Sequence, residues 1–288
     1  MPARADLIAD LHIHSVVSDG ECSPEQVVDL VAAAGFSAMA LTDHDTVAGL
    51  NRAKSRGLER SIEVFSGCEL TAYEGSIELH ILALMVDVAS ESPFIAFLEK
   101  LQKARRVRAQ KIIEKLRAVG IAIDESDVLN IAKEATSIGR PHVAAALVKR
   151  GHAPSLQVAT TRFLQENGPG YVSKTKLTPD DIIAAVHASG GVAILAHPGS
   201  KPHDELIASL FQRGLDGLEA YSSAHSETNC RFYAGLAHRY EKVITGGSDF
   251  HGPTVKPGVQ IGSNGVDRAM LARLRREAER RRALLAAR

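Results

Sequence analysis

The sequence has little of several features that mark common classes of protein. Its three cysteines, Cys22, Cys68 and Cys230, form no close pair, which fits neither a disulfide framework nor a CxxC zinc site. Lysine plus arginine equals aspartate plus glutamate at 34 each, so no overall field draws the chain to nucleic acid or to an anionic membrane. The first thirty residues place charges among short apolar pieces, which predicts neither a signal peptide nor a membrane span. We therefore expect a cytoplasmic protein with no DNA-binding module, no membrane segment and no obligatory protein partner.

Short apolar runs alternate with helical patterns through most of the chain. Runs rich in Ile, Leu and Val predict strands at 6–11, 37–42, 62–66, 77–86, 191–196, 217–220 and 242–245. Helices are expected from Ser23-Pro24-Glu25 to Gly35, at 180–189, at 205–213 and from Arg268 onward. The alternation predicts parallel strands in an α/β fold, either a barrel or an open wound sheet. A length of 288 residues suits one such barrel with an insertion.

Between residues 93 and 170 the strand patterns stop. Helical patterns follow one another there at 93–119, 124–134, 141–150 and 154–166. Loops at the carboxyl ends of barrel strands often carry insertions that cover the site beneath them. The sequence therefore predicts a barrel formed by residues 1–92 and 171–288, with a helical cap inserted at residues 93–170.

Histidine and acidic residues gather where the predicted strands end. His12 and His14 lie two positions apart on the first strand, so both side chains face the same way, and Asp249 and His251 repeat this spacing at the last strand. The other members of this set are Asp19, His44, Glu69, His80, His197 and His225. The set contains seven of the twelve histidines, and burying so many polar groups without a cation would cost several kcal/mol. Mixed imidazole and carboxylate donors predict catalytic divalent ions, with Mn as the leading candidate and Zn or Fe as alternatives.

Six short segments, in family order, resemble the polymerase and histidinol phosphatase (PHP) family. They are His12-x-His14, Ser18-Asp19-Gly20, Thr42-Asp43-His44-Asp45, Gly67-x-Glu69, Ala196-His197-Pro198 and Gly247-Ser248-Asp249-Phe250-His251. The resemblance covers the chain from residue 6 to about residue 252. It implies a distorted seven-stranded β/α barrel that holds two or three divalent ions and hydrolyses phosphate esters.

The resemblance also implies a set of ligands for each ion. One ion would be held by His12, His14, Glu69 and Asp249, a second by Glu69, His80 and His197, and a third by Asp19, His44 and His251. Many relatives carry histidine where this chain has Asp19. A carboxylate oxygen in place of an imidazole nitrogen makes the donor set of the third site harder, in the sense of hard and soft metal ligands. A water or hydroxide shared by two ions would attack phosphorus, and either a third ion would stabilise the leaving oxygen or His197 or His225 would protonate it. Asp10, Asp43 and Asp45 are expected to orient the ligating imidazoles.

Phosphate recognition is expected from the cap, because metal ligands already occupy the end of the barrel. Arg140, in Gly139-Arg140-Pro141-His142, lies at a predicted helix start, where backbone amides and a guanidinium suit an anion. The alternative is a solvated arginine at a helix start. This segment, Gly170-Tyr171-Val172-Ser173 and Ser223-Ala224-His225-Ser226 resemble the PHP subgroup that dephosphorylates nucleoside 3′,5′-bisphosphates and trims short RNAs from the 5′ end. The resemblance implies a small nucleotide or short RNA as substrate, with Arg140, His142, Tyr171 and His225 as candidate contacts.

Other interpretations stay open. A histidinol-phosphate phosphatase shares the barrel and metals but should lack the long cap, and a non-catalytic PHP module would have lost ligands that this chain keeps. An amidohydrolase that cleaves C–N bonds often bridges its metals with a carboxylated lysine, where this chain has Glu69. The basic run Lys103, Arg105, Arg106, Arg108 and Lys111 predicts a solvated helix face, with an RNA-guiding surface as the alternative.

Overall fold

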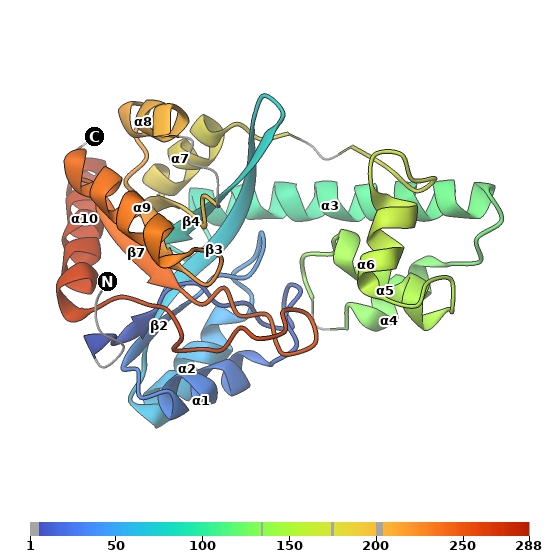
Figure 1. The fold of residues 1–288 in the computed structure, drawn as a ribbon, viewed down its shortest axis with the longest axis horizontal. Helices are drawn as coiled ribbons and strands as arrows, with labels where there is room; N and C mark the ends of the chain where they lie inside the picture. The colour runs from blue at the N-terminus through green and yellow to red at the C-terminus, as the bar shows by residue number, and fades with distance from the viewer. Residues whose placement is uncertain (1–5, 134, 174–175, 200–203, 288) are drawn as a thin grey trace.

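The computed structural model describes residues 6–133, 135–173, 176–199 and 204–287 (Figure 1). Its centre is a mixed sheet whose strands follow one another in sequence order. The strands are β1 (Ala9–Asp10), β2 (Ala38–Leu41), β3 (Glu63–Glu74), β4 (Ile77–Leu84), β5 (Val192–Leu195), β6 (Gly217–Ser222) and β7 (Val243–Gly247). The amide of Leu11 donates to the carbonyl of Gly246 at 3.2 Å, which joins the first strand to the last. The sheet is thus nearly closed, and the predicted distorted barrel is confirmed.

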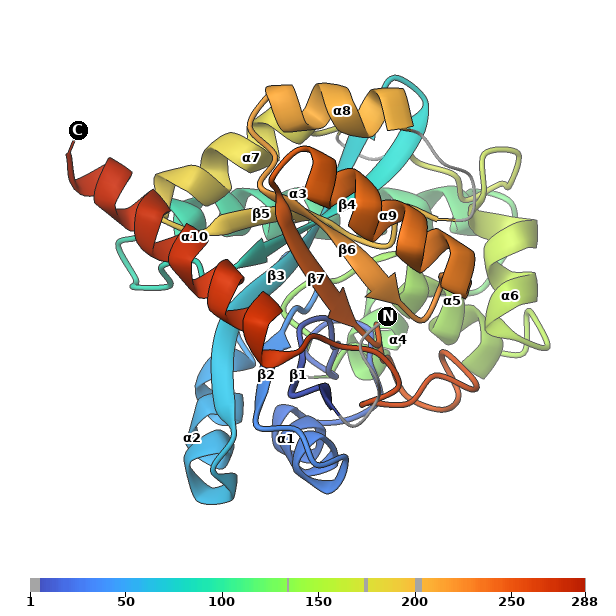
Figure 2. The ribbon, with the colours of Figure 1, turned by 60° about the vertical axis from the view of Figure 1, so that its left-hand side comes forward.

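Helices surround the sheet and extend to one side of it. They are α1 (Pro24–Ala33), α2 (Leu50–Arg60), α3 (Pro93–Ala118), α4 (Glu125–Ile131), α5 (Arg140–Lys149), α6 (Leu156–Ala159), a π-helical turn η2 (Thr160–Leu164), α7 (Pro179–Ala188), α8 (Asp204–Gln212), α9 (Glu227–Arg239) and α10 (Arg268–Ala286). Figure 2 shows α7, α8 and α9 on the outer side of the strands β5 to β7, where α7 packs on β5 and α9 on β6. Among the described helices, none combines the length and the apolar character that a membrane span requires.

The first helix shows how local sequence sets these bounds. The hydroxyl of Ser23 accepts from the amide of Gln26, whose side chain accepts in return from the amide of Ser23 at 2.8 Å. Pro24 fills the first helical position, where a missing N–H costs nothing. Gly35 adopts a φ of 82° just beyond the last turn, which ends the helix. The predicted start and end of this helix are confirmed.

The expectation of parallel strands throughout is wrong for β4. Strand β3 continues past Glu69 to Glu74, and a two-residue turn that begins at Gly75 leads directly into β4. Because so short a turn leaves no room for a crossover helix, β4 runs antiparallel to β3, and it is also antiparallel to β5. Glu69 therefore lies inside a strand instead of at its end. His80 pairs with residue 71, two positions from Glu69, so both side chains point to the same face.

The reversal of β4 also changes how the predicted cap is attached. The carboxyl end of β4 points away from the end of the barrel that carries the candidate ligands, so helix α3 must run back past the barrel. Its 26 residues span about 39 Å. Phe94 and Leu98, in its first half, pack in the barrel core, whereas Ile112 and Leu116 belong to a separate hydrophobic cluster with α4, α5 and η2.

The separate hydrophobic cluster lies within the predicted cap. Helices α3, α4, α5 and α6 and the turn η2 all fall between residues 93 and 170, and Figure 1 shows α4, α5 and α6 beside the far half of α3, away from the strands. Position 134, the predicted end of the second cap helix, lies outside the described residues. The division at residues 92 and 170 stays a prediction.

Candidate metal centre

The candidate ligands meet at one end of the barrel in three groups. In each group the donor atoms all lie within 4.8 Å of one another. The first cluster is His12, His14, Glu69 and Asp249, the second is Glu69, His80 and His197, and the third is His14, Asp19, His44 and His251. The structure thus brings together every residue predicted as a ligand. It also places His14 in the third cluster, which the sequence did not predict.

Glu69 lies between the first two clusters. Its Oε2 is 3.2 Å from Nε2 of His12 and 3.1 Å from Nε2 of His14. Its Oε1 is 2.7 Å from Nδ1 of His80 and 3.0 Å from Nε2 of His197. Because one oxygen faces each cluster, this carboxylate has the geometry of a bridge between two cations.

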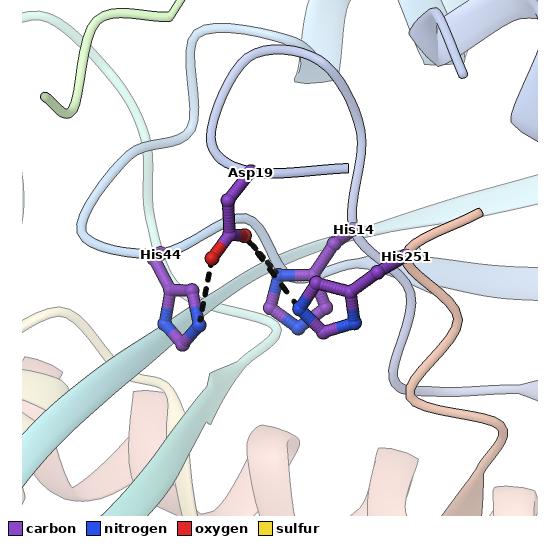
Figure 3. Close-up of side chains that lie close together, drawn as sticks. All are labelled: His14, Asp19, His44 and His251. Atoms are coloured by element: carbon purple, nitrogen blue, oxygen red, sulfur yellow. Dashed lines mark ion pairs between the residues drawn. The ribbon is translucent and has the colours of Figure 1, made fainter. Parts of the chain in front are cut away.

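The third cluster forms around Asp19, which lies in the loop after β1 (Figure 3). Its carboxylate is 3.8 Å from Nδ1 of His14, 3.8 Å from Nε2 of His44 and 3.6 Å from Nε2 of His251. These separations exceed hydrogen-bond length. Donors that share an ion at about 2.0–2.2 Å lie roughly 3–4 Å apart, so the spacing suits a shared cation.

Two candidate ligands sit on strained backbone. Asp249 has a φ of 54° and His197 a φ of 21°, a region that residues with a β-carbon seldom adopt. The amide of Asp249 donates to the carbonyl of His12 at 2.8 Å, and the amide of His197 donates to Oε2 of Glu219 at 2.7 Å. Such strain persists only where the surroundings hold it, and it gathers at functional sites.

Glu219, on β6, is a functional residue that sequence reasoning missed. It is fully buried, its Oε1 lies 3.0 Å from Nδ1 of His12, and its Oε2 accepts from the amide of His197. It thereby orients His12 so that Nε2 faces the first cluster. The signal that identifies it is a glutamate within the otherwise apolar buried strand that runs from Gly217 to Ala220.

The three carboxylates that were predicted to orient imidazoles have other partners. Asp10 accepts from the amide of His12 at 3.2 Å, and Asp43 accepts from the amide of Ser15 at 2.7 Å. Asp45 pairs with Arg105 of the predicted cap. Among the described hydrogen bonds, none joins these three carboxylates to a ligating ring. Asp10 and Asp43 thus hold backbone segments that carry ligands.

The charges in the centre depend strongly on one another. Burial opposes ionisation of Glu69, yet the nearby histidines, His80 foremost, hold its pKa well below the usual range. Burial also opposes charge on His14, but hydrogen bonds with Asp249 and Glu69 raise its pKa to about 10. Burial lowers the pKa of His44 to about 3. Ionised carboxylates are thus balanced by protons on some imidazoles, and those protons must leave when a divalent cation binds.

Several buried ligand atoms make only long contacts with the protein. Among the described residues, Nδ1 of His44 lies 3.4 Å from Oε2 of Glu69, Oδ1 of Asp249 lies 3.5 Å from Nε2 of His14, and Nδ1 of His14 lies 3.8 Å from Asp19, and none of the three atoms has a hydrogen bond of good geometry. Unpaired buried polar atoms are costly, and mixed imidazole and carboxylate donors suit Mn, Zn or Fe. The residues present therefore fit divalent cations. Lys256, from the loop after β7, contacts Oδ2 of Asp249, a contact that sequence reasoning also missed.

A pocket lies between the third cluster and the predicted cap. It is lined by the candidate ligands Asp19, His44 and His80 and by the arginines Arg105, Arg108 and Arg140. The other lining residues include Tyr73, Glu78, Leu101, Ile112, Ile138 and Pro141. The predicted phosphate contact Arg140 thus faces the same space as the candidate ligands.

The expectation of a solvated face is wrong for two residues of the basic run. Arg105 lines the pocket and forms an ion pair with Asp45. Arg108 also lines it, and its Nε donates to the carbonyl of Val172 at 2.8 Å. Sequence reasoning missed them because a helix distributes a basic run around its axis, and only the packing of α3 decides which members face inward. Lys103, Arg106 and Lys111 are exposed, as expected.

The structure places two candidate substrate contacts outside this pocket. His142 is buried at the start of α5, where its Nδ1 accepts from the amide of Gly139 at 3.1 Å. The carbonyl of Tyr171 accepts from Nζ of Lys115 at 2.7 Å. Neither His142 nor Tyr171 is among the residues that line the pocket.

The structure does bring His225 close to the segment of His197. Nδ1 of His225 donates to the carbonyl of Ala220 at 3.0 Å, and its Nε2 accepts from the amide of Gly199 at 3.2 Å. Both ring nitrogens are therefore engaged by the backbone. This arrangement favours a positioning role for His225 over proton donation.

Comparison with known proteins identifies relatives along most of the chain. It is 32% identical over 249 residues to a 3′,5′-nucleoside bisphosphate phosphatase of Chromobacterium violaceum, covering 85% of this chain and 87% of the relative. It is 33% identical over 250 residues to a phosphoribosyl 1,2-cyclic phosphate 1,2-diphosphodiesterase of Eggerthella lenta, covering 85% and 95%. It is 30% identical over 264 residues to the 5′-3′ exoribonuclease Rnm of Escherichia coli, covering 89% and 88%.

Solved structures are also similar to this chain along most of its length. A structure described as a metal-dependent phosphoesterase from Bifidobacterium adolescentis has a TM-score of 0.85 at 30% identity, covering 94% of this chain and 96% of that chain. A structure described as an amidohydrolase from Chromobacterium violaceum with bound sulfate and no metal has a TM-score of 0.80 at 31% identity, covering 95% and 96%. The sequence model of the PHP domain matches residues 10–228, which is more than half of the chain. The chain therefore belongs to the PHP domain family and is a metal-dependent hydrolase that acts on phosphate esters.

Proposed function

We propose that the chain removes a phosphate group from small nucleotides that carry two phosphates, nucleoside 3′,5′-bisphosphates first, and that it also trims short RNAs from the 5′ end. The observation that carries this proposal is a single pocket lined both by candidate metal ligands and by three arginines. A substrate with two anionic groups can engage the cations and the arginines at once. A substrate with one phosphate at the cations leaves Arg108 and Arg140 without an anionic partner among the described residues.

The three arginines are crowded in a way that favours a bound anion. Burial lowers the pKa of Arg108, and the neighbouring charges of Arg140 and then Arg105 lower it further. Of the three, Arg105 has a carboxylate partner in Asp45. Guanidinium groups bind phosphate through two parallel hydrogen bonds, so a phosphate among these side chains relieves their mutual repulsion.

The proposed mechanism assigns each part of the site a task. We propose the nine residues of the three clusters as the ligands of two or three divalent cations, which supply Lewis-acid activation of the phosphate and of the attacking water when bound. Glu219 holds the ring of His12 and the backbone of His197 in place. Arg140 and Arg108 bind the second phosphate and so fix the orientation of the substrate. Nε2 of His197 points at Glu69, which favours a ligand role for it over proton donation.

The names of the relatives support a substrate with two phosphate groups. The Chromobacterium violaceum relative is a nucleoside bisphosphate phosphatase, and the Escherichia coli relative is an exoribonuclease. The Eggerthella lenta relative acts on a phosphoribosyl cyclic phosphate, which also carries two phosphates and is therefore the second candidate substrate. Histidinol phosphate carries one phosphate and does not use the arginines. A C–N hydrolase is less favoured because Glu69 occupies the bridging position and three arginines line the pocket.

The test is release of phosphate from a substrate panel, and release of nucleotides from the RNA in it, with Mn, Zn or Mg added. The panel contains adenosine 3′,5′-bisphosphate, adenosine monophosphate, a phosphoribosyl 1,2-cyclic phosphate, histidinol phosphate and a short 5′-phosphorylated RNA. A second phosphate held by charged hydrogen bonds contributes about 1.5–3 kcal/mol, so we expect the bisphosphate to exceed the monophosphate by about 10–100-fold in kcat/KM. Equal turnover of histidinol phosphate and the bisphosphate would contradict the proposal. Metal analysis of the purified protein tests our preference for Mn over Zn or Fe.

A further inference from the structure

We propose that the outer side of α3 carries a second binding surface for single-stranded RNA, which holds the backbone of the nucleotides that follow the one in the pocket. This inference rests on the proposed function and extends it. The surface is a groove lined by Lys100, Lys103, Ala104, Val107, Arg108, Lys111, Val172 and Ser173, called the α3 groove below.

The α3 groove joins the pocket along one ridge of the helix. The pocket is lined from α3 by residues 101, 104, 105, 108, 109 and 112, and the groove by residues 100, 103, 104, 107, 108 and 111. The second set is the first shifted by one position toward the N-terminus, which rotates it by about 100° around the helix axis. Ala104 and Arg108 belong to both sets. A chain bound in the pocket can therefore pass over this ridge into the groove.

The charge of the α3 groove is not neutralised by the protein. Four of its lining residues are cations and none is an acid. Lys100, Lys103 and Lys111 are exposed, and no ion pair of theirs occurs within the part of the chain that the structure describes. Nε of Arg108 is anchored to the carbonyl of Val172, which holds this cation at the junction of groove and pocket.

The basic helix at the end of the chain gives a useful contrast. On α10, Arg275 pairs with Glu63, Arg280 pairs with Glu277 and Arg281 pairs with Asp216. Those arginines have carboxylate partners within the protein, whereas the lysines of the α3 groove lack them among the described residues. Unpaired cations in a groove that leads to a phosphoesterase pocket favour a polyanion as their partner.

The shape of the groove indicates how it would bind RNA. Lys100 and Lys111 are eleven positions apart, which is about 16 Å along the helix. That length accommodates several consecutive phosphates. Among the described residues, no aromatic side chain lines the groove, so these residues offer bases no stacking platform. We therefore expect contacts with the backbone and little dependence on RNA sequence.

The experiment compares two variants with the same loss of charge. The groove variant is Lys100→Gln, Lys103→Gln and Lys111→Gln. The control is Arg106→Gln, on an exposed position of α3 that lines neither cavity, with Arg273→Gln and Arg276→Gln on α10. Binding of a 5′-phosphorylated octaribonucleotide with a 3′ fluorophore is measured by anisotropy with a chelator present, which prevents cleavage, over a series of salt concentrations. Phosphate release from adenosine 3′,5′-bisphosphate is measured on the metal-loaded proteins.

We expect the groove variant to bind the octamer at least about tenfold more weakly at 0.1 M salt, with the slope of log affinity against log salt reduced by about 2, since each single-strand phosphate contact contributes about 0.7. We expect the control to match the unmodified chain, and all three proteins to hydrolyse the bisphosphate at similar rates. Unchanged octamer binding in the groove variant, or an equal loss of binding in the control, would contradict the proposal that the α3 groove binds RNA. The proposed function fails separately, if the unmodified chain releases no phosphate from nucleotides. In that case the binding measurement still tests whether the α3 groove binds RNA.

Discussion

The metal clusters and the arginines of the pocket are held in different ways. At the end of the barrel the side chain of Glu69 is 1% exposed and that of Asp249 is 8% exposed, and both contact several imidazoles. The side chain of Arg105 is 25% exposed, and Arg105, Arg108 and Arg140 come from helices that extend to a second hydrophobic cluster. Under the proposed function, the sheet holds the metal ligands, whereas α3 and α5 supply the side chains that select the substrate.

The largest effect is expected at the barrel end. Replacing Glu69 by glutamine keeps the shape of the side chain but removes the charge that faces two clusters. We expect bound metal to fall at both clusters and phosphate release to fall by more than about 100-fold, the upper range for an outer partner of a metal site. Metal analysis and initial rates of the same preparations test this, with Glu59→Gln on exposed α2 as a control. Loss of a single ion with the rest of the metal retained would argue against a bridge.

A smaller and different effect is expected at Arg140. Replacing Arg140 by alanine removes a charged hydrogen-bond donor worth about 1.5–3 kcal/mol, so kcat/KM for the bisphosphate should fall by about 10–100-fold. The metal content should not change, because Arg140 belongs to none of the three clusters of candidate ligands. Rates for adenosine monophosphate provide the control and should change little. Loss of metal in this variant would refute the assignment of Arg140 to phosphate binding.

Glu219 is expected to change the affinity for metal without being a ligand itself. Replacing Glu219 by glutamine keeps a side chain that can bond to the amide of His197 but weakens the contact with His12. We expect metal affinity to fall by about tenfold, near the lower end of the range for outer partners. Titration with Mn measures this affinity, and excess Mn should restore the rate. A rate that stays low at saturating Mn would show that Glu219 acts on the reaction in another way.

The smallest effect on chemistry is expected from the core of the predicted cap. Leu147 is fully buried in the second hydrophobic cluster, so Leu147→Ala should reduce stability by about 2–5 kcal/mol. If barrel and cap unfold separately, calorimetry should show an earlier transition for the cap, while the barrel keeps its metal. A single transition that moves as a whole would show that the two parts form one cooperative unit, and would argue against the division at residues 92 and 170.

Much of the fold was predictable because its signals are local. Apolar runs, the capped start of the first helix and Gly35 at its end all depend on neighbouring residues. The direction of β4 was not predictable in this way, because the alternation of strands and helices suggested a crossover where the chain makes a short turn at Gly75. One consequence is that Glu69 lies inside β3, beside His80, and not at a strand end.

The candidate ligands were predictable as a set, whereas their partners were not. Residues two positions apart, as are His12 and His14, face the same side of an extended chain, so their spacing alone brings two donor groups together. Glu219 and Lys256 have no such spacing, and their importance appears only through contacts with His12 and Asp249. Arg105 and Arg108 were placed on a solvated face because charge alone does not tell which side of a helix packs inward.

The sequence by itself determined which residue types are available and where short-range geometry places them: apolar strands, helix caps and paired donor residues. Only the tertiary structure decided that Glu69 faces two clusters, that α3 runs back past the barrel, and that Arg105, Arg108 and Arg140 face the candidate ligands. The physical reason is the separation along the chain over which each effect acts. Backbone preferences act over a few residues, whereas burial and charge act between side chains that only packing brings together.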